Sequence, residues 1–127
     1  MNFKHTLKKE ERISLQKEID FLFAQGNSFI VFPLRIVYLE RRPVTGVEVA
    51  VFVSVPKRKF KHAVDRNYIK RLIREAYRLN KRSLEWIKNK DTGLLIAFLF
   101  VGNERVSYKE VEVALIKAFN SLKEKLQ

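Results

Sequence analysis

Apolar residues recur with helical spacing in three parts of the chain. The pattern predicts a helix from Ser14 to about Gln25, ended by Gly26, and a second helix over 63–80 with a shorter helical piece after it. A third helix is expected after Ser107, because Glu110 three residues later would complete a capping box ahead of a periodic apolar run to the end of the chain.

Between these helices lie runs rich in β-forming residues. Residues 29–40 form one such run, interrupted by Pro33, and residues 47–55 form another. The turn-like stretch 41–46 between them predicts a hairpin. Residues 94–101, LLIAFLFV, are apolar on both faces and are expected to form a central strand.

This order of elements predicts an α/β or α+β sandwich in which helices cover the sheet mainly on one side. The 127 residues contain no linker, repeat or low-complexity tract, so we expect a single domain over 1–127. Most of the ten Phe residues, among them Phe52, Phe98 and Phe119, are expected in the core, whereas Phe21 lies opposite the apolar face of the first helix.

The composition argues against several classes of enzyme. Cysteine is absent, which excludes disulfides and thiolate chemistry, and only His5 and His62 could supply an imidazole. The acidic residues are dispersed, so no carboxylate cluster for metal-assisted hydrolysis is visible, and His62 is more readily explained as an exposed or phosphate-contacting residue than as a general base. No apolar run reaches the roughly 20 residues of a membrane span, and the first residues lack a secretory h-region, so we expect a cytoplasmic protein without membrane contact.

Positive charge is concentrated in one segment. Residues 57–82 hold eleven Lys and Arg, opposed only by Asp65 and Glu75, whereas the rest of the chain is nearly balanced within a formal net charge of +12. Counterion release from a phosphate backbone rewards such a patch, which points to nucleic acid as the partner. The alternative is a solvated helix face that only keeps the protein soluble.

The predicted helix 63–80 separates apolar from basic residues. Ile69, Leu72 and Ile73 fall on one side, and on the other the spacing of Arg66, Lys70, Arg74 and Arg78 brings like charges together. Each such pair destabilises a helix by a few tenths of a kcal/mol. A bound polyanion would remove this repulsion, so the charged side is the predicted polyanion-binding surface.

The stretch AVDRNYIKRLIREAYR, residues 63–78, resembles the signature segment of the bacterial ribonuclease P protein subunit. The family pattern is Ala-Val-x-Arg-Asn-x-x-Lys-Arg-x-x-Arg-Glu. The matching residues are Ala63, Val64, Arg66, Asn67, Lys70, Arg71, Arg74 and Glu75. The preceding VSVPKRK and the helix ending in Gly26 are also similar, and the resemblance covers essentially the whole chain. The chain departs from the family at Tyr68, where Arg is usual, and in the loop 57–62, which lacks a frequent glycine and is one residue longer.

The resemblance implies a protein that binds the catalytic ribonuclease P RNA in a 1:1 complex, together with the 5′ leader of precursor tRNA. In such a holoenzyme the RNA subunit catalyses endonucleolytic removal of the leader and holds the magnesium, while the protein has no active site and binds no cofactor, metal or DNA. The implied fold is an α–β sandwich with a sheet of about four strands and a left-handed β–α–β crossover (ribosomal protein S5 domain 2-like). The alternative function is a general RNA-binding or ribosome-associated protein without a role in cleavage.

Two groups of site residues follow. Those expected to contact the catalytic RNA are Lys57, Arg58, Lys59, Lys61, Arg66, Asn67, Lys70, Arg71, Arg74 and Arg78. Members of the family bind the leader between the first helix and the sheet, where this chain offers Ile19, Phe23, Arg35 and Val37. Strand alternation places Arg35 and Val37 opposite a uniformly apolar face, which suits such a cleft. The alternative is that Ile19 and Phe23 simply pack on the sheet.

Overall fold

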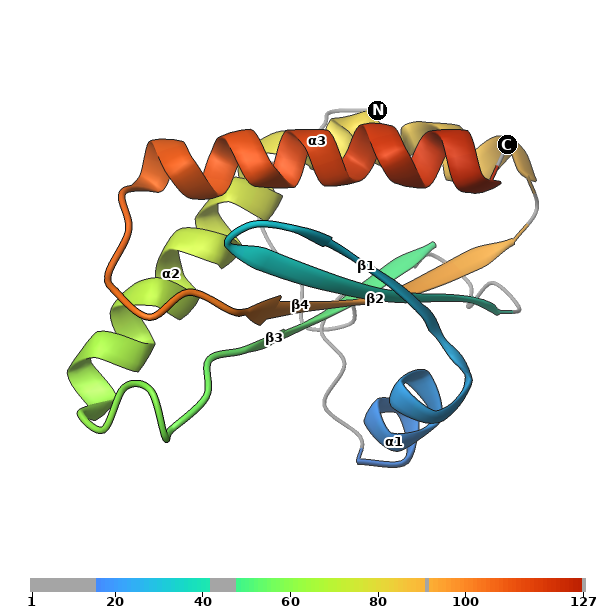
Figure 1. The fold of residues 1–127 in the computed structure, drawn as a ribbon. Coiled ribbons are helices and arrows are strands. Elements are labelled where there is room, and N and C mark those ends of the chain that lie inside the picture. Colours follow the sequence, from blue (N-terminus) through green and yellow to red (C-terminus); the bar gives the residue numbers. More distant parts are fainter. Residues whose placement is uncertain (1–15, 42–47, 91, 127) are drawn as a thin grey trace.

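The computed structural model describes residues 16–41, 48–90 and 92–126, which form a four-stranded sheet with helices on both faces (Figure 1). The α+β class predicted from the sequence is confirmed. In chain order the elements are α1 (Gln16–Gln25), β1 (Asn27–Val31), β2 (Leu34–Arg41), β3 (Val49–Ser54), α2 (Ala63–Asn80), the 3-10 helix η2 (Lys81–Lys90), β4 (Gly93–Phe100) and α3 (Tyr108–Leu126).

The predicted β run 29–40 is two strands. It divides at Phe32 and Pro33, which are joined by a cis peptide bond, and β1 returns along β2 as an antiparallel hairpin with Ile30 opposite Arg35. Proline has no backbone N–H to give to a sheet, so a turn is the place that suits it.

The predicted hairpin between residues 29–40 and 47–55 is wrong. The strand order is β1-β2-β4-β3, so β4 lies between β2 and β3, antiparallel to the first and parallel to the second. The prediction assumed that neighbours in sequence pair, whereas β4 is apolar on both faces and takes the central position. Residues 42–46 of the predicted turn 41–46 lie outside the described residues, as does residue 47 of the predicted strand.

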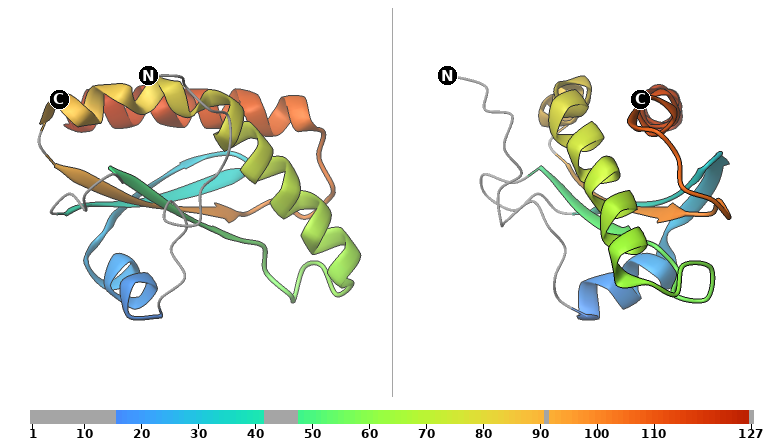
Figure 2. Two further views of the ribbon diagram at one scale, coloured as in Figure 1. Left: turned by 180° about the vertical axis from the view of Figure 1, so that it is seen from behind. Right: turned by 90° about the vertical axis from the view of Figure 1, so that its left-hand side faces the viewer.

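The connection from β3 through α2 to β4 is left-handed. In the right-hand view of Figure 2 both strands run toward the viewer, α2 runs back above the sheet, and the chain comes down to β4 on the right of β3. General rules favour the right-handed form in about 98% of cases. The left-handed crossover implied by the family resemblance is therefore confirmed against the general expectation.

One face of the sheet carries the main core beneath α2 and α3. Ile36, Ile96 and Phe98 from this face are completely buried, and so are Ile69 and Ile73 of α2. The apolar positions of α3 that were expected inside are all buried as well: Val111, Ala114, Leu115, Ala118, Phe119 and Leu122. Helix α2 has the predicted bounds, and Ser107 Oγ accepts a hydrogen bond from the Glu110 amide at 3.2 Å ahead of α3.

The opposite face carries a smaller core beneath α1. Leu22 is fully buried among Val37, Leu95 and Ala97. The chain leaves α1 through Gly26, whose amide donates to the Leu22 carbonyl at 2.8 Å. The predicted start of this helix, Ser14, lies outside the described residues.

Gly26 passes so close to neighbouring backbone that a side chain does not fit. A Cβ atom there would lie 2.5 Å from the Leu22 carbonyl oxygen and 2.9 Å from that of Tyr38. We expect Gly26→Ala to lower the free energy of unfolding by about 1–3 kcal/mol, because the clash is with backbone and cannot be relieved by a rotamer change. Urea unfolding measures this, and Gln25→Ala, a change at the exposed neighbouring residue, should leave stability within about 0.5 kcal/mol. Equal stabilities of the two variants would contradict the packing described here.

Candidate nucleic-acid interface

Helix α2 presents its polar side to solvent along its length. Asn67, Arg71 and Arg74 are exposed, and Lys70 is partly so. The apolar residues Ile69, Ile73 and Ala76, with Tyr77, hold the other side against the sheet and α3. The structure thus brings the predicted RNA-binding residues of the helix onto one accessible surface, which we call the basic face.

The basic loop before α2 is fixed in place. Phe60 is buried, with its ring centroid 5.7 Å from that of Phe100, and Lys59 Nζ donates to the Val101 carbonyl at 3.2 Å. Arg66 Nη1 donates to the carbonyl oxygens of Phe60 at 2.7 Å and Lys61 at 3.0 Å. The loop therefore holds its exposed cations Lys57, Arg58, Lys59 and Lys61 in a defined position beside the start of α2.

Arg66 and Arg78, both predicted to bind RNA, are engaged by other groups of the protein. Arg66 anchors the loop, and Arg78 forms an ion pair with Glu75, to which its Nε donates at 3.1 Å. This hydrogen bond lowers the pKa of Glu75 and raises that of Arg78. Any phosphate contact by Arg66 or Arg78 would share the guanidinium with these partners.

A polar cluster joins the end of α2 to the start of α3. Tyr108 Oη donates to Glu112 Oε2 at 2.9 Å, and Asn80 Nδ2 donates to the same oxygen at 3.2 Å. Burial, with the bond to Glu112, raises the pKa of Tyr108 to about 12, while the bonds from Asn80 and Tyr108 lower the pKa of Glu112. The cluster holds the two helices together, so the position of the basic face is set by α3 as well as by the sheet.

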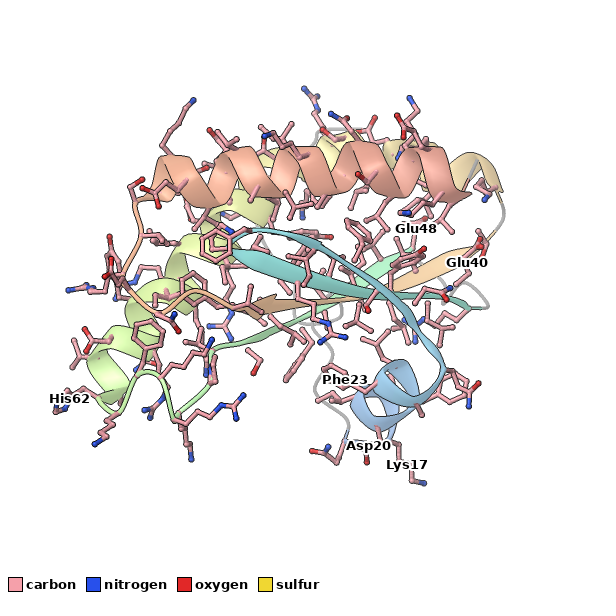
Figure 3. The ribbon with its side chains drawn as sticks, viewed as in Figure 1. Lys17, Asp20, Phe23, Glu40, Glu48 and His62 are labelled. Carbon is pink, nitrogen blue, oxygen red and sulfur yellow. The ribbon has the colours of Figure 1, made fainter. Side chains whose placement is uncertain are left out.

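His62 stands exposed at the start of α2, beside the basic loop, and makes no side-chain capping bond to the helix. Glu40 and Glu48 lie at the other end of the sheet (Figure 3), where Lys90 Nζ is 3.5 Å from Glu40 Oε2. These two acids are thus remote from the basic loop and from the start of α2.

The face of the sheet below the main core is only partly covered. Strand register places Val37 and Phe52 on either side of Ala97, and α1 packs against this row. The next row is Ile30, Arg35, Leu99 and Ser54. In this second row Ile30 is 63% exposed and Arg35 is exposed, so α1 leaves that part of the face uncovered. Figure 1 shows α1 beneath one end of the sheet, with no described helix beneath the other.

Phe23 of α1 borders this uncovered region. Its side chain lies on the inner side of α1, away from Lys17 and Asp20 (Figure 3), and it is 43% exposed. Its ring meets that of Phe52 edge-on at 6.4 Å between centroids. Arg35 is exposed on the neighbouring row, with its Nη2 3.3 Å from Ser28 Oγ.

The four predicted cleft residues therefore share one surface but differ in access. Phe23 and Arg35 are exposed, Ile19 is partly buried against the smaller core, and Val37 is only 5% exposed. Phe52 is half-buried and packs against the smaller core, in line with the core position that the sequence suggested, and its ring also borders this surface. Alternation in β3 puts Phe52 on the same side as Ala50 and Ser54, and this is the signal that could have placed it beside the predicted cleft.

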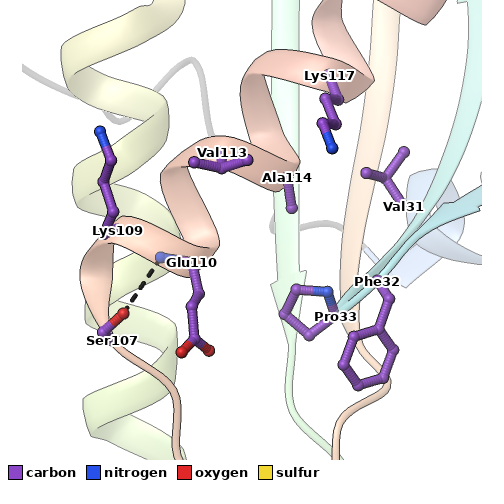
Figure 4. A pocket seen from close by; sticks show the side chains of 9 residues that line it. All are labelled: Val31, Phe32, Pro33, Ser107, Lys109, Glu110, Val113, Ala114 and Lys117. Atoms are coloured by element: carbon purple, nitrogen blue, oxygen red, sulfur yellow. Dashed lines mark hydrogen bonds between the residues drawn. The ribbon is translucent and has the colours of Figure 1, made fainter.

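A separate groove of about 620 Å³ lies between the β1–β2 turn and the first half of α3 (Figure 4). Its walls are mostly apolar and include Phe32, which is 70% exposed, and Val113, with Lys109 and Lys117 from α3. None of the residues predicted to bind RNA lines it.

Within residues 16–41, 48–90 and 92–126 there is no group of three or more His, Cys, Asp or Glu residues that could hold a metal ion. Of the helices described, none is long and apolar enough to cross a membrane.

The sequence is similar to one protein family over nearly its whole length. A family model described as Ribonuclease P matches residues 7–123. A protein from Porphyromonas gingivalis named Ribonuclease P protein component is 41% identical over 113 residues, which are 88% of this chain and 82% of that protein. A protein of the same name from Chlorobaculum tepidum is 40% identical over 87 residues, 62% of this chain and 56% of the relative.

Solved structures share the fold at lower identity. The RNase P protein of Staphylococcus aureus superposes with a TM-score of 0.69 at 18% identity, covering 89% of this chain and 95% of that one. The RNase P protein from Thermotoga maritima gives the same TM-score at 21% identity, covering 87% and 96%.

The contacts of Arg66 predict that it keeps the basic loop ordered. Arg66→Ala removes both hydrogen bonds to the carbonyl oxygens of Phe60 and Lys61, so we expect faster amide hydrogen exchange across residues 57–61. Arg71→Ala, which removes an equal charge one helical turn away, should leave exchange in the loop unchanged. Equal exchange in the Arg66 variant and the unmodified protein would show that the loop is held by Phe60 and Lys59 alone.

Proposed function

Since the chain belongs to the ribonuclease P protein family, we propose that it is the protein subunit of a ribonuclease P holoenzyme acting in tRNA 5′ maturation. In this proposal one copy of the protein binds one catalytic RNA through the basic loop and the basic face of α2. The uncovered face of the sheet beside α1 receives the single-stranded 5′ leader of precursor tRNA.

The observation that carries the proposal is the ordered basic face. Its exposed cations, Arg71 and Arg74 with Lys57 and Arg58 of the loop, are mounted on a helix and a loop that the core and Arg66 hold rigid. Phosphate binding to such a surface needs little further ordering of the protein. Arginine also suits phosphate because its planar guanidinium can donate two parallel hydrogen bonds.

The uncovered sheet face has the chemistry that a single strand needs. Phe23 and Phe52 offer aromatic surface at one side, and Arg35 offers a cation on the next row. Single-stranded nucleic acid is held by stacking on aromatic rings and by basic side chains along the backbone. These contacts do not depend on the base, which suits a leader whose sequence differs between tRNAs.

The division of labour follows from the family. We propose that the RNA subunit holds the magnesium ions and performs the hydrolysis. The protein supplies positive charge and orients the RNA and the precursor, and it binds no cofactor itself. This arrangement assigns no proton transfer to any side chain of the protein.

The experiment is reconstitution of cleavage with a ribonuclease P RNA at low magnesium, comparing the protein with Arg71→Ala/Arg74→Ala. We expect the unmodified protein to restore leader removal, and its affinity for the RNA to fall with salt with a log–log slope of about −4 to −5 if about six phosphates are neutralised. The double variant should keep its fold and lose RNA affinity, with a shallower slope.

A matched control is Lys117→Ala/Lys123→Ala, which removes the same charge from exposed positions on α3. This variant should bind nearly as the unmodified protein does. A protein that binds RNA but fails to restore cleavage would indicate a general RNA-binding protein, and equal affinity of both double variants would refute the assignment of the basic face.

Phe23 tests the leader surface. Phe23→Ala removes one aromatic platform, and stacking contributes about 1–3 kcal/mol per base, so the holoenzyme should lose affinity for precursor tRNA while its affinity for mature tRNA stays the same. Phe21→Ala is the matched control, because Phe21 is 54% exposed on the same helix and lies about 160° around it from Phe23. Equal losses for precursor and mature tRNA, or an equal effect of the two variants, would contradict this assignment.

A further inference from the structure

The segment between β4 and α3 places a cation on α2. This segment runs beside the helix (Figure 1), and the guanidinium carbon of Arg105 lies 3.9 Å from the ring centroid of Tyr68. The hydroxyl of Tyr68 donates to the Val106 carbonyl at 3.5 Å, so the ring is held against the same segment. Arg105 is remote in sequence from the basic segment 57–82, and its position becomes visible only in the fold.

The same guanidinium lies beside one of the two acids of the basic segment. Arg105 Nε is 3.7 Å from Asp65 Oδ1. Uncompensated, the carboxylate of Asp65 would repel a phosphate approaching the first turns of α2. Arg105 offsets this charge. The electrostatic potential near Asp65 therefore stays positive, although the sequence alone suggests that it is lowered there.

The position of Tyr68 places Arg105 at the border of the basic face. At 100° per residue, Tyr68 lies about 60° around the helix from Arg71, on the side that faces α3. Arg105 therefore extends the row of exposed cations of α2 toward α3. The Arg105 side chain is 52% exposed, so solvent and ligands reach it.

The contacts of Arg105 contribute little to stability, so a role in folding does not explain its position. An exposed cation–π contact contributes about 0.5–1 kcal/mol and an exposed ion pair about 0–1 kcal/mol. Within the described residues, this guanidinium contacts Tyr68 and Asp65, and its distance to Asp65 is longer than a hydrogen bond. Most of its five N–H donors thus stay available while the flat ring restricts its motion.

We propose that Arg105 is a phosphate-binding residue of the RNA interface, and that Tyr68 is the positioning residue that holds it on α2. The inference rests on the proposed function, because it takes the RNA bound by the basic face as the ligand. The interface then consists of two separate segments of chain, α2 with its loop and the β4–α3 connection. A guanidinium held in advance on an aromatic ring loses less entropy when it binds a phosphate.

The test measures the affinity of the full-length protein for the ribonuclease P RNA over a range of salt concentrations. Arg105→Ala should weaken binding roughly 5- to 10-fold at low salt, as expected for one exposed charge-assisted contact, and should reduce the salt slope by about 1. Lys123→Ala removes the same charge from an exposed position on α3 and should have a much smaller effect. A loss no larger than that of Lys123→Ala would overturn the proposal.

Tyr68 is tested through its coupling to Arg105. Tyr68→Ala alone should weaken binding, but when it is combined with Arg105→Ala it should cause no further loss. Tyr68→Phe keeps the ring and should bind normally. In the Arg105→Ala background, Tyr68→Arg should restore affinity, because it returns a cation to the same part of the helix surface. Additive losses at the two positions, or failure of Tyr68→Arg to restore binding, would overturn the positioning role.

The Arg71→Ala/Arg74→Ala variant separates this inference from the proposed function. If that variant loses affinity while Arg105→Ala does not, the basic face stands and the inference about Arg105 is wrong. If neither variant changes affinity, the proposed interface itself is refuted, and the inference with it. Urea unfolding of each variant identifies any loss of binding that comes from a loss of fold.

Discussion

Strand β4 has to be hidden from water on both faces, and the placement of the described helices follows from this requirement. Ile96 and Phe98 alternate with Leu95 and Ala97, and all four are buried, with β2 on one side and β3 on the other. One face therefore needs α2 and α3 above it, and the other needs α1 below it. Because β3 is parallel to β4, the chain must cross over between them, and α2 is that crossing. The helix that carries the basic face is thus part of the support of the central strand.

The sequence predicts the parts of this structure that local signals determine. Helix α2 and the start of α3 at Ser107 depend on spacing and capping within a few residues, and both are confirmed. The pairing of β3 with β4 depends on contacts between segments distant in sequence. Adjacency in sequence predicted pairing with residues 29–40 instead, which is wrong. The candidate site divides in the same way, since the cations of α2 are visible in its periodicity. The positions of Phe52 and Arg105 require the register of β3 and the path of the β4–α3 connection.

The like charges on α2 are tolerated because burial of its other side outweighs them. Repulsion between neighbouring cations costs a few tenths of a kcal/mol per pair, whereas a fully buried Ile contributes about 1.5–3 kcal/mol. Ile69 and Ile73 are both completely buried. The burial of this side is therefore enough to hold the helix without a bound polyanion. The free energy gained by burying one side of α2 therefore allows the exposed side to carry several like charges close together.

The two surfaces that the proposal assigns to RNA are joined by a short and rigid piece of chain. Phe52 and Ser54 lie on the uncovered face of the sheet, and the basic loop begins at Lys57. Val55 between them is buried, and Phe60 anchors the far end of the loop in the main core. Val55 and Phe60 both belong to the main core, so a displacement of the loop would disturb that core. Because the connection is fixed at both ends, the proposed function would hold a leader lying across the sheet and an RNA bound to α2 in one relative position, and this positioning is the contribution that we propose for the protein.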